Sequence, residues 1–540
     1  MITKANSGRV WLFVQWLVHF AVIAICVGAP VPGVNESHYL PKAKHSWDSD
    51  FAPNDLFLSS HDSHLLASKL AGVISSNTSL ERTAWIGRLL SWALFAAAWI
   101  RLGRSIGLSS WISPFAFGAW FLAMHYGHWA GEWAIGGFEA KTIAYPFVLF
   151  GIADAVQRKW QRAWVLLAIA VAWHPLAGGW AGLTVGIAWL IEVRRGESTI
   201  RSQLPWLALG VAIGLIGVWP AFSGIGGADR VGKVVASQVH VYYRLAHHMS
   251  PRTFAAERHW AAVVSLVLLS VATVAYFAMH RKGKAKDCSG RILLVIAWSS
   301  VAIALVGLGI DSFLSVAQPS IASKLLRFYW FRWADVVVPL AWTLVSWSLL
   351  ARSVELLGIS NSMAATKFRT CLCIGAAAGV TVFVVLRFLE NQQAVPEGDR
   401  LLVEAVGPFD PNSDRLADWQ NACSWVRENS PHDSLWLTPK HQQTFKWYAG
   451  RAEVVCWKDV PQDNPSVFEW FSRVQNCEPP HYNTGGIAAW QAWQLRLLHD
   501  RYKFGWLLVD NSVQNLALPF EQVYPANVDD NPSFSVFKID

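Results

Sequence analysis

Charged residues are scarce in this chain of 540 residues: they make up 15% of it, whereas hydrophobic residues make up 53%. Ordinary soluble domains carry about a quarter charged residues. The deficit excludes a soluble globule and indicates a polytopic α-helical protein embedded in a lipid bilayer. The net charge of +8 does not indicate nucleic-acid binding, because the basic residues form short clusters between apolar runs rather than one basic face.

Sequence signatures of several protein classes are also missing. The seven cysteines form no C-x-x-C pair and no zinc spacing. The chain contains no phosphate-binding loop, dinucleotide fingerprint or nucleophile elbow. It also lacks the paired interruptions expected of inverted transporter repeats. Three cysteines near the C-terminus, Cys423, Cys456 and Cys477, allow at most one disulfide.

Long apolar runs are the most prominent feature that is present. The first, residues 11–29, contains no charged residue and exceeds the apolar core of about 7–15 residues in a signal peptide, so we expect a retained membrane span. Later runs centre on 83–100, 109–125, 142–157, 163–174, 176–192, 203–220, 260–279, 292–310, 332–351 and 370–388. Residues 1–390 are therefore predicted to form a membrane domain of about eleven helices.

The distribution of basic residues predicts the orientation of these helices. Lys and Arg concentrate in the short connections on the side of the N-terminus, beginning with Lys4 and Arg9, and the positive-inside rule places that side in the cytoplasm. The opposite connections are long: 31–81, 126–141, 223–258 and 311–330. Because elaborated loops on a rigid scaffold usually carry function, we expect the working face to be the outer face of the cytoplasmic (inner) membrane.

Beyond residue 390 the composition becomes that of a soluble domain. An amphipathic helix is expected over 415–429, capped by Ser413 or Asp414, and a second over 487–502. Strand-like runs occur at Ser434–Thr438, Ala452–Trp457, Gly505–Asp510 and Ser533–Lys538. Alternating strands and helices predict a small α/β domain over 391–540, and eleven spans would place it outside the membrane.

The first long outer connection holds the leading catalytic candidate, Glu36, in the stretch Gly33-Val34-Asn35-Glu36-Ser37-His38-Tyr39. A carboxylate there can accept a proton from a hydroxyl or bind a divalent cation such as Mg or Mn. Asp48, Asp50 and Asp55 follow and could supply a second oxygen ligand, with Glu36 and Asp50 as the possible metal pair. The ordinary alternative is that these acids only solvate a wet loop, which we favour for Asp62.

Asn35-Glu36-Ser37-His38-Tyr39 is similar to the acid-acid-x-x-Tyr pattern of GT-C membrane glycosyltransferases, and the predicted spans and outer C-terminal domain also resemble that class. The resemblance implies transfer of a sugar from a polyprenyl-phosphate donor, with first-loop acids acting as base or metal ligands. It makes Glu36 the catalytic residue. Asn35 departs from the pattern, which often has Asp there, so the partner acid must come from elsewhere.

The second outer connection offers such a partner. Glu132 and Glu139 lie in it, and Glu139 follows Gly136-Gly137-Phe138 at the start of a span. GT-C enzymes often add a second acidic residue from such a loop. The alternative is a Glu139–Lys141 pair at a helix start, where the helix dipole already favours a carboxylate. The catalytic candidates are therefore Glu36 with Asp50, Asp55 or Glu139.

Candidates for binding a donor phosphate lie in the third and fourth connections. Arg244, His247 and His248 are close in sequence, and a guanidinium grips phosphate oxygens in a fork. The alternative is a basic stretch resting on lipid headgroups. Arg332 lies three residues before Asp335 and could pair with it, although a charge at a span end is also a functional candidate.

These patterns favour a glycosyltransferase that uses a polyprenyl-phosphate-linked sugar on the outer face of the membrane. The alternative is a protein without enzymatic activity, either a lipid or glycan transporter or an assembly factor. Sugar, acceptor and oligomeric state do not follow from the sequence. Sequons at Asn35 and Asn77 lie on the predicted outer face.

Overall fold

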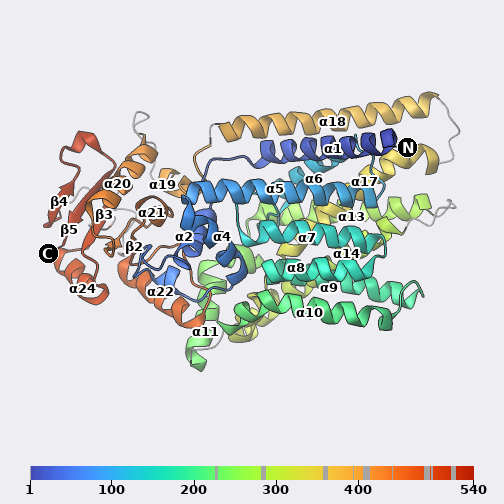
Figure 1. Cartoon of the computed structure of the whole chain (residues 1–540). Coiled ribbons are helices and arrows are strands. Elements are labelled where there is room, and N and C mark those ends of the chain that lie inside the picture. Colours follow the sequence, from blue (N-terminus) through green and yellow to red (C-terminus); the bar gives the residue numbers. More distant parts are fainter. Residues whose placement is uncertain are drawn as a thin grey trace.

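The computed structural model shows a long helical bundle with a small sheet at one end (Figure 1). It describes residues 2–224, 229–280, 288–356, 363–392, 394–404, 414–440, 442–478, 487, 490–511 and 518–539. The predicted cap Ser413 and part of a basic connection, Arg281 to Lys286, lie outside these residues.

Each of the predicted apolar runs is a helix in the structure. These are α1 (Ile2–Val27), α5 (Leu80–Ser105), α6 (Ser113–Gly127), α7 (Ala140–Val156), α8 (Trp160–Trp173), α9 (Pro175–Arg194), α10 (Ile200–Ser223), α13 (Ala256–His280), α14 (Ser289–Gly309), α17 (Arg332–Leu356) and α18 (Met363–Gln392). Among the described residues, 8 helices are long and apolar enough to cross a membrane. The protein is a multi-pass membrane protein, whereas the count of eleven spans stays a prediction because α6, α7 and α8 are shorter.

Aromatic side chains form much of the core of the bundle. Tryptophan and phenylalanine side chains fill the interior, and Trp92, Phe95, Trp99, Phe117 and Trp120 are all buried. The outer helices α10, α13 and α18 instead expose large apolar side chains, a pattern that suits contact with lipid rather than water. The chain breaks between α8 and α9, where the His174 ring accepts a 3.1 Å hydrogen bond from the Ala177 amide and Pro175 begins α9.

The long connections are helical themselves, which the sequence analysis did not anticipate. The first contains α2 (Glu36–His45), α3 (Leu56–Ser59) and α4 (Leu65–Asn77). The third contains α11 (Arg230–Gln238), η1 (Val239–Arg244), α12 (Ala246–Met249) and η2 (Pro251–Thr253), and the fourth contains η3 (Ile310–Leu314), α15 (Ser315–Ala317) and α16 (Pro319–Leu326). These connections lie together at the end of the bundle that carries the sheet (Figure 1).

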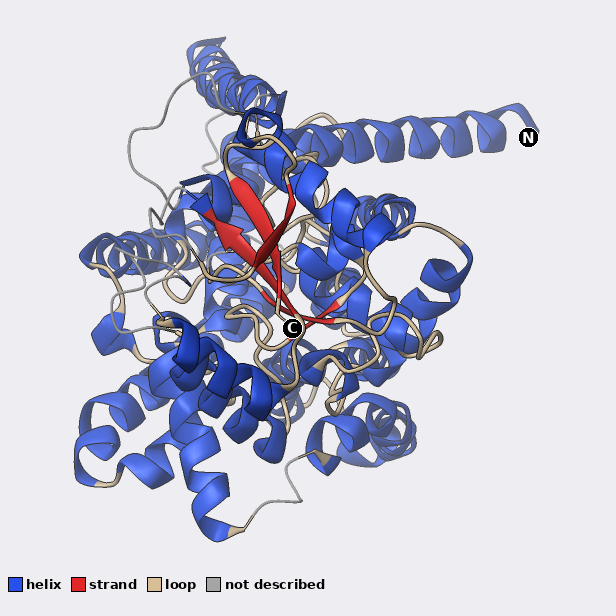
Figure 2. Ribbon diagram, turned by 90° about the vertical axis from the view of Figure 1, so that its left-hand side faces the viewer, coloured by secondary structure: helices blue, strands red, loops and turns tan. Residues whose placement is uncertain are grey.

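The C-terminal elements form a five-stranded sheet with flanking helices. They are α19 (Arg400–Glu404), α20 (Arg415–Asn429), β1 (Leu435–Leu437), α21 (Phe445–Ala449), β2 (Ala452–Glu453), α22 (Asn464–Cys477), α24 (Ala492–Tyr502), β3 (Trp506–Asp510), β4 (Glu521–Tyr524), η6 (Val528–Asp530) and β5 (Phe534–Lys538). The strand order is β2-β1-β3-β5-β4, with parallel pairs on one side and antiparallel pairs on the other. Figure 2 views the molecule from this end.

Several predicted elements of this region are confirmed. Asp414 caps α20 by accepting from the Ala417 amide at 3.1 Å, and each of the four predicted strand runs contains a strand. Four elements of this region, α19, α21, α22 and β4, were not predicted from the sequence. Cys423, Cys456 and Cys477 are buried free thiols, so no disulfide joins them. The domain boundary at residue 390 stays a prediction.

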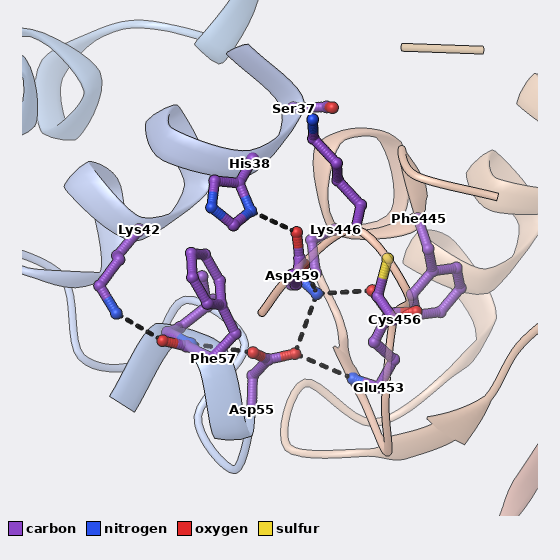
Figure 3. A network of polar contacts seen from close by, with 12 residues as sticks. Ser37, His38, Lys42, Asp55, Phe57, Phe445, Lys446, Glu453, Cys456 and Asp459 are labelled. Carbon is purple, nitrogen blue, oxygen red and sulfur yellow. Dashed lines mark hydrogen bonds and ion pairs between the residues drawn. The ribbon is translucent and has the colours of Figure 1, made fainter. Parts of the chain in front are cut away.

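A buried polar cluster joins the first connection to the C-terminal region (Figure 3). The Lys446 ammonium lies 2.5 Å from carboxylate oxygens of Glu453 and Asp459 and 3.3 Å from Asp55. His38 lies 2.7 Å from the other oxygen of Asp459. Burial raises the pKa of the Asp459 carboxyl, but Lys446 and His38 outweigh it and hold that pKa at about 2. This cluster fixes α2 and α3 against the C-terminal region.

Replacing Lys446 with Met should destabilise the protein by about 3–5 kcal/mol, because three buried carboxylates would lose their shared cation. The measurement is chemical unfolding of detergent-solubilised protein, followed by tryptophan fluorescence. Lys538→Met, which removes an exposed lysine from β5, is the control. Equal stability of the two variants would contradict this role of Lys446.

Candidate active site

Glu36 is buried at the end of the bundle and holds three segments together. It is 1% exposed, so the alternative of an acid that only solvates a wet loop does not hold for this residue. Its oxygens accept hydrogen bonds of 2.6 to 2.7 Å from Arg88 in α5, from the Gly33 amide and from the Phe138 amide. Gly137 allows this approach, because a Cβ there would lie 3.0 Å from the Glu36 carboxyl carbon. Glu36 therefore ties the first connection to α5 and to the second connection.

The same glutamate lines a cavity of about 640 Å³, which we name the glutamate cavity. Glu36, Glu139 and His248 line it, so the structure brings three of the predicted site residues to one place, and Glu132 lines it as well. Arg88, Arg258, Arg387 and Arg400 also line it. Apolar side chains, among them Phe121, Met124 and Ile135, line it as well. The charged groups of both signs suit a ligand that carries hydroxyl or amide groups.

A second cavity, of about 580 Å³, has a different character, and we name it the amphiphilic cavity. Of the described residues in its lining, Lys233, Lys324, Arg327 and Arg332 are basic and Glu132 alone is acidic. Leu176, Trp180, Ala221, Phe222, Leu325, Phe328 and Trp333 supply an apolar wall. An anionic head attached to an apolar chain would match this lining in both charge and polarity.

Glu132 lies at the wall between the two cavities and lines both. One of its oxygens accepts a 3.1 Å hydrogen bond from the Tyr145 hydroxyl and lies 3.5 Å from the Lys141 ammonium. The other lies 3.3 Å from Arg332 in an ion pair but is buried without a hydrogen-bond partner. This second oxygen is therefore paired in charge with Arg332 but keeps an unused capacity to accept a hydrogen bond.

Glu139 continues the wall on the side of the first connection. The predicted Glu139–Lys141 pair is present at 3.6 Å, and the same ammonium pairs with Glu132. Asn35 donates to Glu139 at 3.0 Å, and Trp133 donates to its other oxygen at 3.0 Å. Position 35 thus provides an amide donor to Glu139, where an aspartate would place two carboxylates side by side.

Further buried polar atoms face the amphiphilic cavity without partners. Among the described residues that line it, His64 Nδ1, His240 Nδ1, Arg332 Nε and Gln462 Oε1 have no hydrogen bond. Burial, followed by the charges of Arg327, Arg244 and Arg332, lowers the pKa of His240 well below its ordinary value. Buried unsatisfied polar groups cost free energy, so their number here indicates a binding site for a polar group.

Four predicted site residues lie outside both cavities. Asp50 is exposed, and Asp55 belongs to the Lys446 cluster, where it also caps α3 through the Leu58 amide. The Arg244 side chain donates to the backbone oxygen of Trp457 at 2.8 Å. His247 is exposed. Arg332, by contrast, lines the amphiphilic cavity.

The suggested Arg332–Asp335 pair is wrong. Asp335 instead accepts hydrogen bonds from the backbone amides of Trp129, Ala130 and Glu132 at 2.7 to 3.2 Å. These bonds hold the second connection against the start of α17 and leave Arg332 to pair with Glu132. Asp335 thereby fixes the backbone position of Glu132.

Sequence reasoning missed the cavity residues that come from distant segments. His64 stacks on His174 with ring centroids 4.8 Å apart, and Gln462 and Asn464 reach the amphiphilic cavity from the C-terminal region. No local motif marks these residues. The signal that was available for Glu132 was its neighbourhood, a glycine-rich outer connection between two spans.

The suggested divalent cation does not fit the acids of this site. Both Glu36 oxygens accept hydrogen bonds from Arg88, and Asp50 lines neither cavity. Lys141 lies between Glu132 and Glu139, at the position where a bridging cation would neutralise them. A separate buried group, Glu453, Cys456 and Asp459, has ligand atoms within 4.8 Å of one another, but Lys446 already bonds to two of its members.

Comparison with known proteins identifies solved structures similar to this chain but does not assign the whole chain to a family. Residues 417–477 match a domain of unknown function, DUF6798. No curated protein matches the chain.

Among solved structures, the Archaeoglobus fulgidus oligosaccharyltransferase AglB in complex with an inhibitory peptide and a dolichol-phosphate is 12% identical, with a TM-score of 0.44, over 94% of this chain and 70% of that one. Cupriavidus metallidurans ArnT bound to undecaprenyl phosphate is 14% identical, with a TM-score of 0.45, over 99% and 98% of the two chains.

Both similar proteins are GT-C-type membrane glycosyltransferases, the class to which the sequence resemblance pointed. At TM-scores below 0.5 this likeness adds no weight to an activity. Any argument for a function therefore rests on the side chains of the two cavities.

The Glu36–Arg88 pair provides a test of its structural role. Glu36→Gln should destabilise the protein, because it leaves the Arg88 guanidinium buried without a counter-charge. The double variant Glu36→Gln with Arg88→Met should recover part of that loss, since it removes the isolated charge as well. Thermal unfolding of the single and double variants in detergent measures this coupling. Strictly additive losses would contradict a coupled pair.

Proposed function

We propose that this protein is a membrane glycosyltransferase that moves a sugar from a polyprenyl-phosphate donor to an acceptor hydroxyl on the outer face of the cytoplasmic membrane. The observation that carries the proposal is the position of Glu132, which lines both cavities and keeps one buried oxygen without a hydrogen bond. The amphiphilic cavity would hold the donor and the glutamate cavity the acceptor. The sugar would then pass between them at Glu132.

The charges of the amphiphilic cavity support the assignment of the donor. Its four basic side chains exceed its one acidic side chain, and Arg327 and Arg332 can each grip a phosphate oxygen pair. The apolar wall along α9 and α16 suits the first units of a polyprenyl chain. Phosphate leaving the sugar gains negative charge, which these cations would stabilise in the transition state.

The reaction follows from this placement. The acceptor oxygen forms a bond to the anomeric carbon of the sugar while the bond from that carbon to the phosphate oxygen breaks. The acceptor proton passes to the Glu132 oxygen that has no hydrogen bond, and the electron pair of the broken bond stays on the lipid phosphate. A single displacement of this kind inverts the anomeric centre. General-base catalysis of this type contributes about 10²- to 10⁴-fold in rate.

Glu36 and Glu139 take supporting roles in this mechanism. Glu36 fixes the second connection through the Phe138 amide, and Glu139 helps to hold Lys141 beside Glu132. Lys141 provides the positive charge that a divalent cation would otherwise supply between the two acids.

Glu132→Gln should lower the rate of sugar transfer by about 10²- to 10⁴-fold, because the amide cannot accept the acceptor proton. The assay measures transfer from radiolabelled undecaprenyl-phosphate sugars in membranes that contain the protein. Asp50→Asn, which neutralises an exposed acid of the first connection, is the matched control and should keep full activity. Equal rates for wild type and Glu132→Gln would refute the assignment of the base.

Chelation provides an independent test of the role of Lys141. Because this lysine takes the place of a bridging cation, transfer by the wild-type protein should be unchanged in EDTA. Loss of transfer in EDTA, with recovery on adding Mg²⁺ or Mn²⁺, would contradict this account and restore the metal hypothesis.

A further inference from the structure

A segment of the C-terminal region, residues 457–464, contacts the outer connections from both sides of the site, and we name it the strap. Arg244 of the third connection donates to the backbone oxygen of Trp457 at 2.8 Å. Arg327 of the fourth connection donates to the Asn464 side chain at 2.9 Å. In the first connection, the His61 amide donates to Asp463 at 3.1 Å. The strap lies within the residues that match DUF6798.

Lys458 of the strap reaches the wall between the two cavities. Its ammonium donates to the Asn35 side-chain oxygen at 2.9 Å, and the Asn35 amide nitrogen donates to Glu139 at 3.0 Å. The lysine thus fixes which end of the Asn35 amide faces Glu139. Glu139 in turn pairs with Lys141, which also pairs with Glu132. A continuous chain of polar contacts therefore joins the strap to the proposed base.

Gln462 of the strap is one of the residues that line the amphiphilic cavity. Its side-chain oxygen is buried and has no hydrogen-bond partner. An amide oxygen accepts hydrogen bonds, whereas phosphate oxygens at neutral pH offer essentially no donor. The group that matches Gln462 is therefore a donor such as a sugar hydroxyl, and Arg327, held by the neighbouring Asn464, suits the phosphate.

The strap is continuous with a hydrophobic cluster that includes its own buried Val460. Trp470 of α22 is buried against Val467 and Val474 of the same helix and against Ala236 and Val239 from the third connection. Its ring nitrogen donates to the backbone oxygen of Cys456 at 2.9 Å, directly before the strap. Rigid support of this kind is what a positioning residue requires.

We propose that the strap is a working part of the transfer site: Gln462 recognises a hydroxyl of the donor sugar, and Lys458 positions Glu139 through Asn35. This inference rests on the proposed function and assigns to the matched DUF6798 segment a role in choosing the sugar. The C-terminal region would then recognise the sugar of the donor, and the membrane bundle would bind its polyprenyl chain.

The test separates recognition of the sugar from recognition of the lipid phosphate. Wild type and Gln462→Ala, in nanodiscs, are titrated with undecaprenyl phosphate and with undecaprenyl phosphates that carry glucose, galactose, mannose or N-acetylglucosamine. Wild type should bind at least one sugar-bearing lipid more tightly than the bare lipid. Gln462→Ala should weaken that binding by about fivefold, the value of one hydrogen bond, and leave the affinity for bare undecaprenyl phosphate unchanged.

Arg327→Gln is the matched variant, because it should weaken bare and sugar-bearing lipids alike. A wild type without preference for any sugar, or a Gln462→Ala variant that keeps the preference, would overturn the role of Gln462. Failure of wild type to bind any of these lipids would instead refute the proposed function itself.

Lys458→Met is tested by the steady-state kinetics of transfer. It should lower kcat by about 10- to 100-fold, the cost of misplacing a catalytic group, with the KM for the donor within about threefold of wild type; Lys458→Arg should recover part of the rate. Lys538→Met is the control for loss of a lysine in the same region. An unchanged kcat in Lys458→Met, or a loss matched by the loss of folded protein, would overturn the positioning role.

Discussion

One buried ammonium, that of Lys141, lies between two glutamates at the wall of two cavities, and the proposed chemistry depends on it. Glu132 and Glu139 approach this nitrogen at 3.5 and 3.6 Å. Without an internal cation, the two buried carboxylates would repel each other. The surrounding contacts support this arrangement: Asp335 fixes the backbone of Glu132, Glu36 fixes the second connection, and Asn35 donates to Glu139.

The two cavities differ in the kind of molecule that they can hold. In the proposed reaction this difference assigns the donor to one cavity and the acceptor to the other. Cations and apolar walls in the amphiphilic cavity match a lipid phosphate, whereas charges of both signs in the glutamate cavity match a polar acceptor. A group that lines both can act at the point where their ligands meet. Glu132 is such a group. Arg332, 3.3 Å from it, would place a cation for the donor phosphate at the same point. Proton acceptance and leaving-group stabilisation would thus occur side by side.

The sequence predicted the helices well and the site only in part. Apolar runs such as 11–29 are local signals that need no tertiary context, so each became a helix. Glu36, the leading candidate from the sequence, lines the glutamate cavity, but its partner Arg88 lies in the middle of an apolar run and no motif marks it. Glu132 was one candidate among several acids, because the backbone bonds from Asp335 that position it are visible only in three dimensions. The contact of Lys458 with Asn35 joins residues far apart in the chain, and no periodicity or motif could have predicted it.

The account can be tested most directly by an experimental structure with undecaprenyl phosphate bound. The account predicts that the phosphate lies in the amphiphilic cavity within hydrogen-bonding distance of Arg332, with the lipid chain along Leu176, Trp180 and Phe328. A phosphate bound in the glutamate cavity, or on Arg244 away from Glu132, would contradict it.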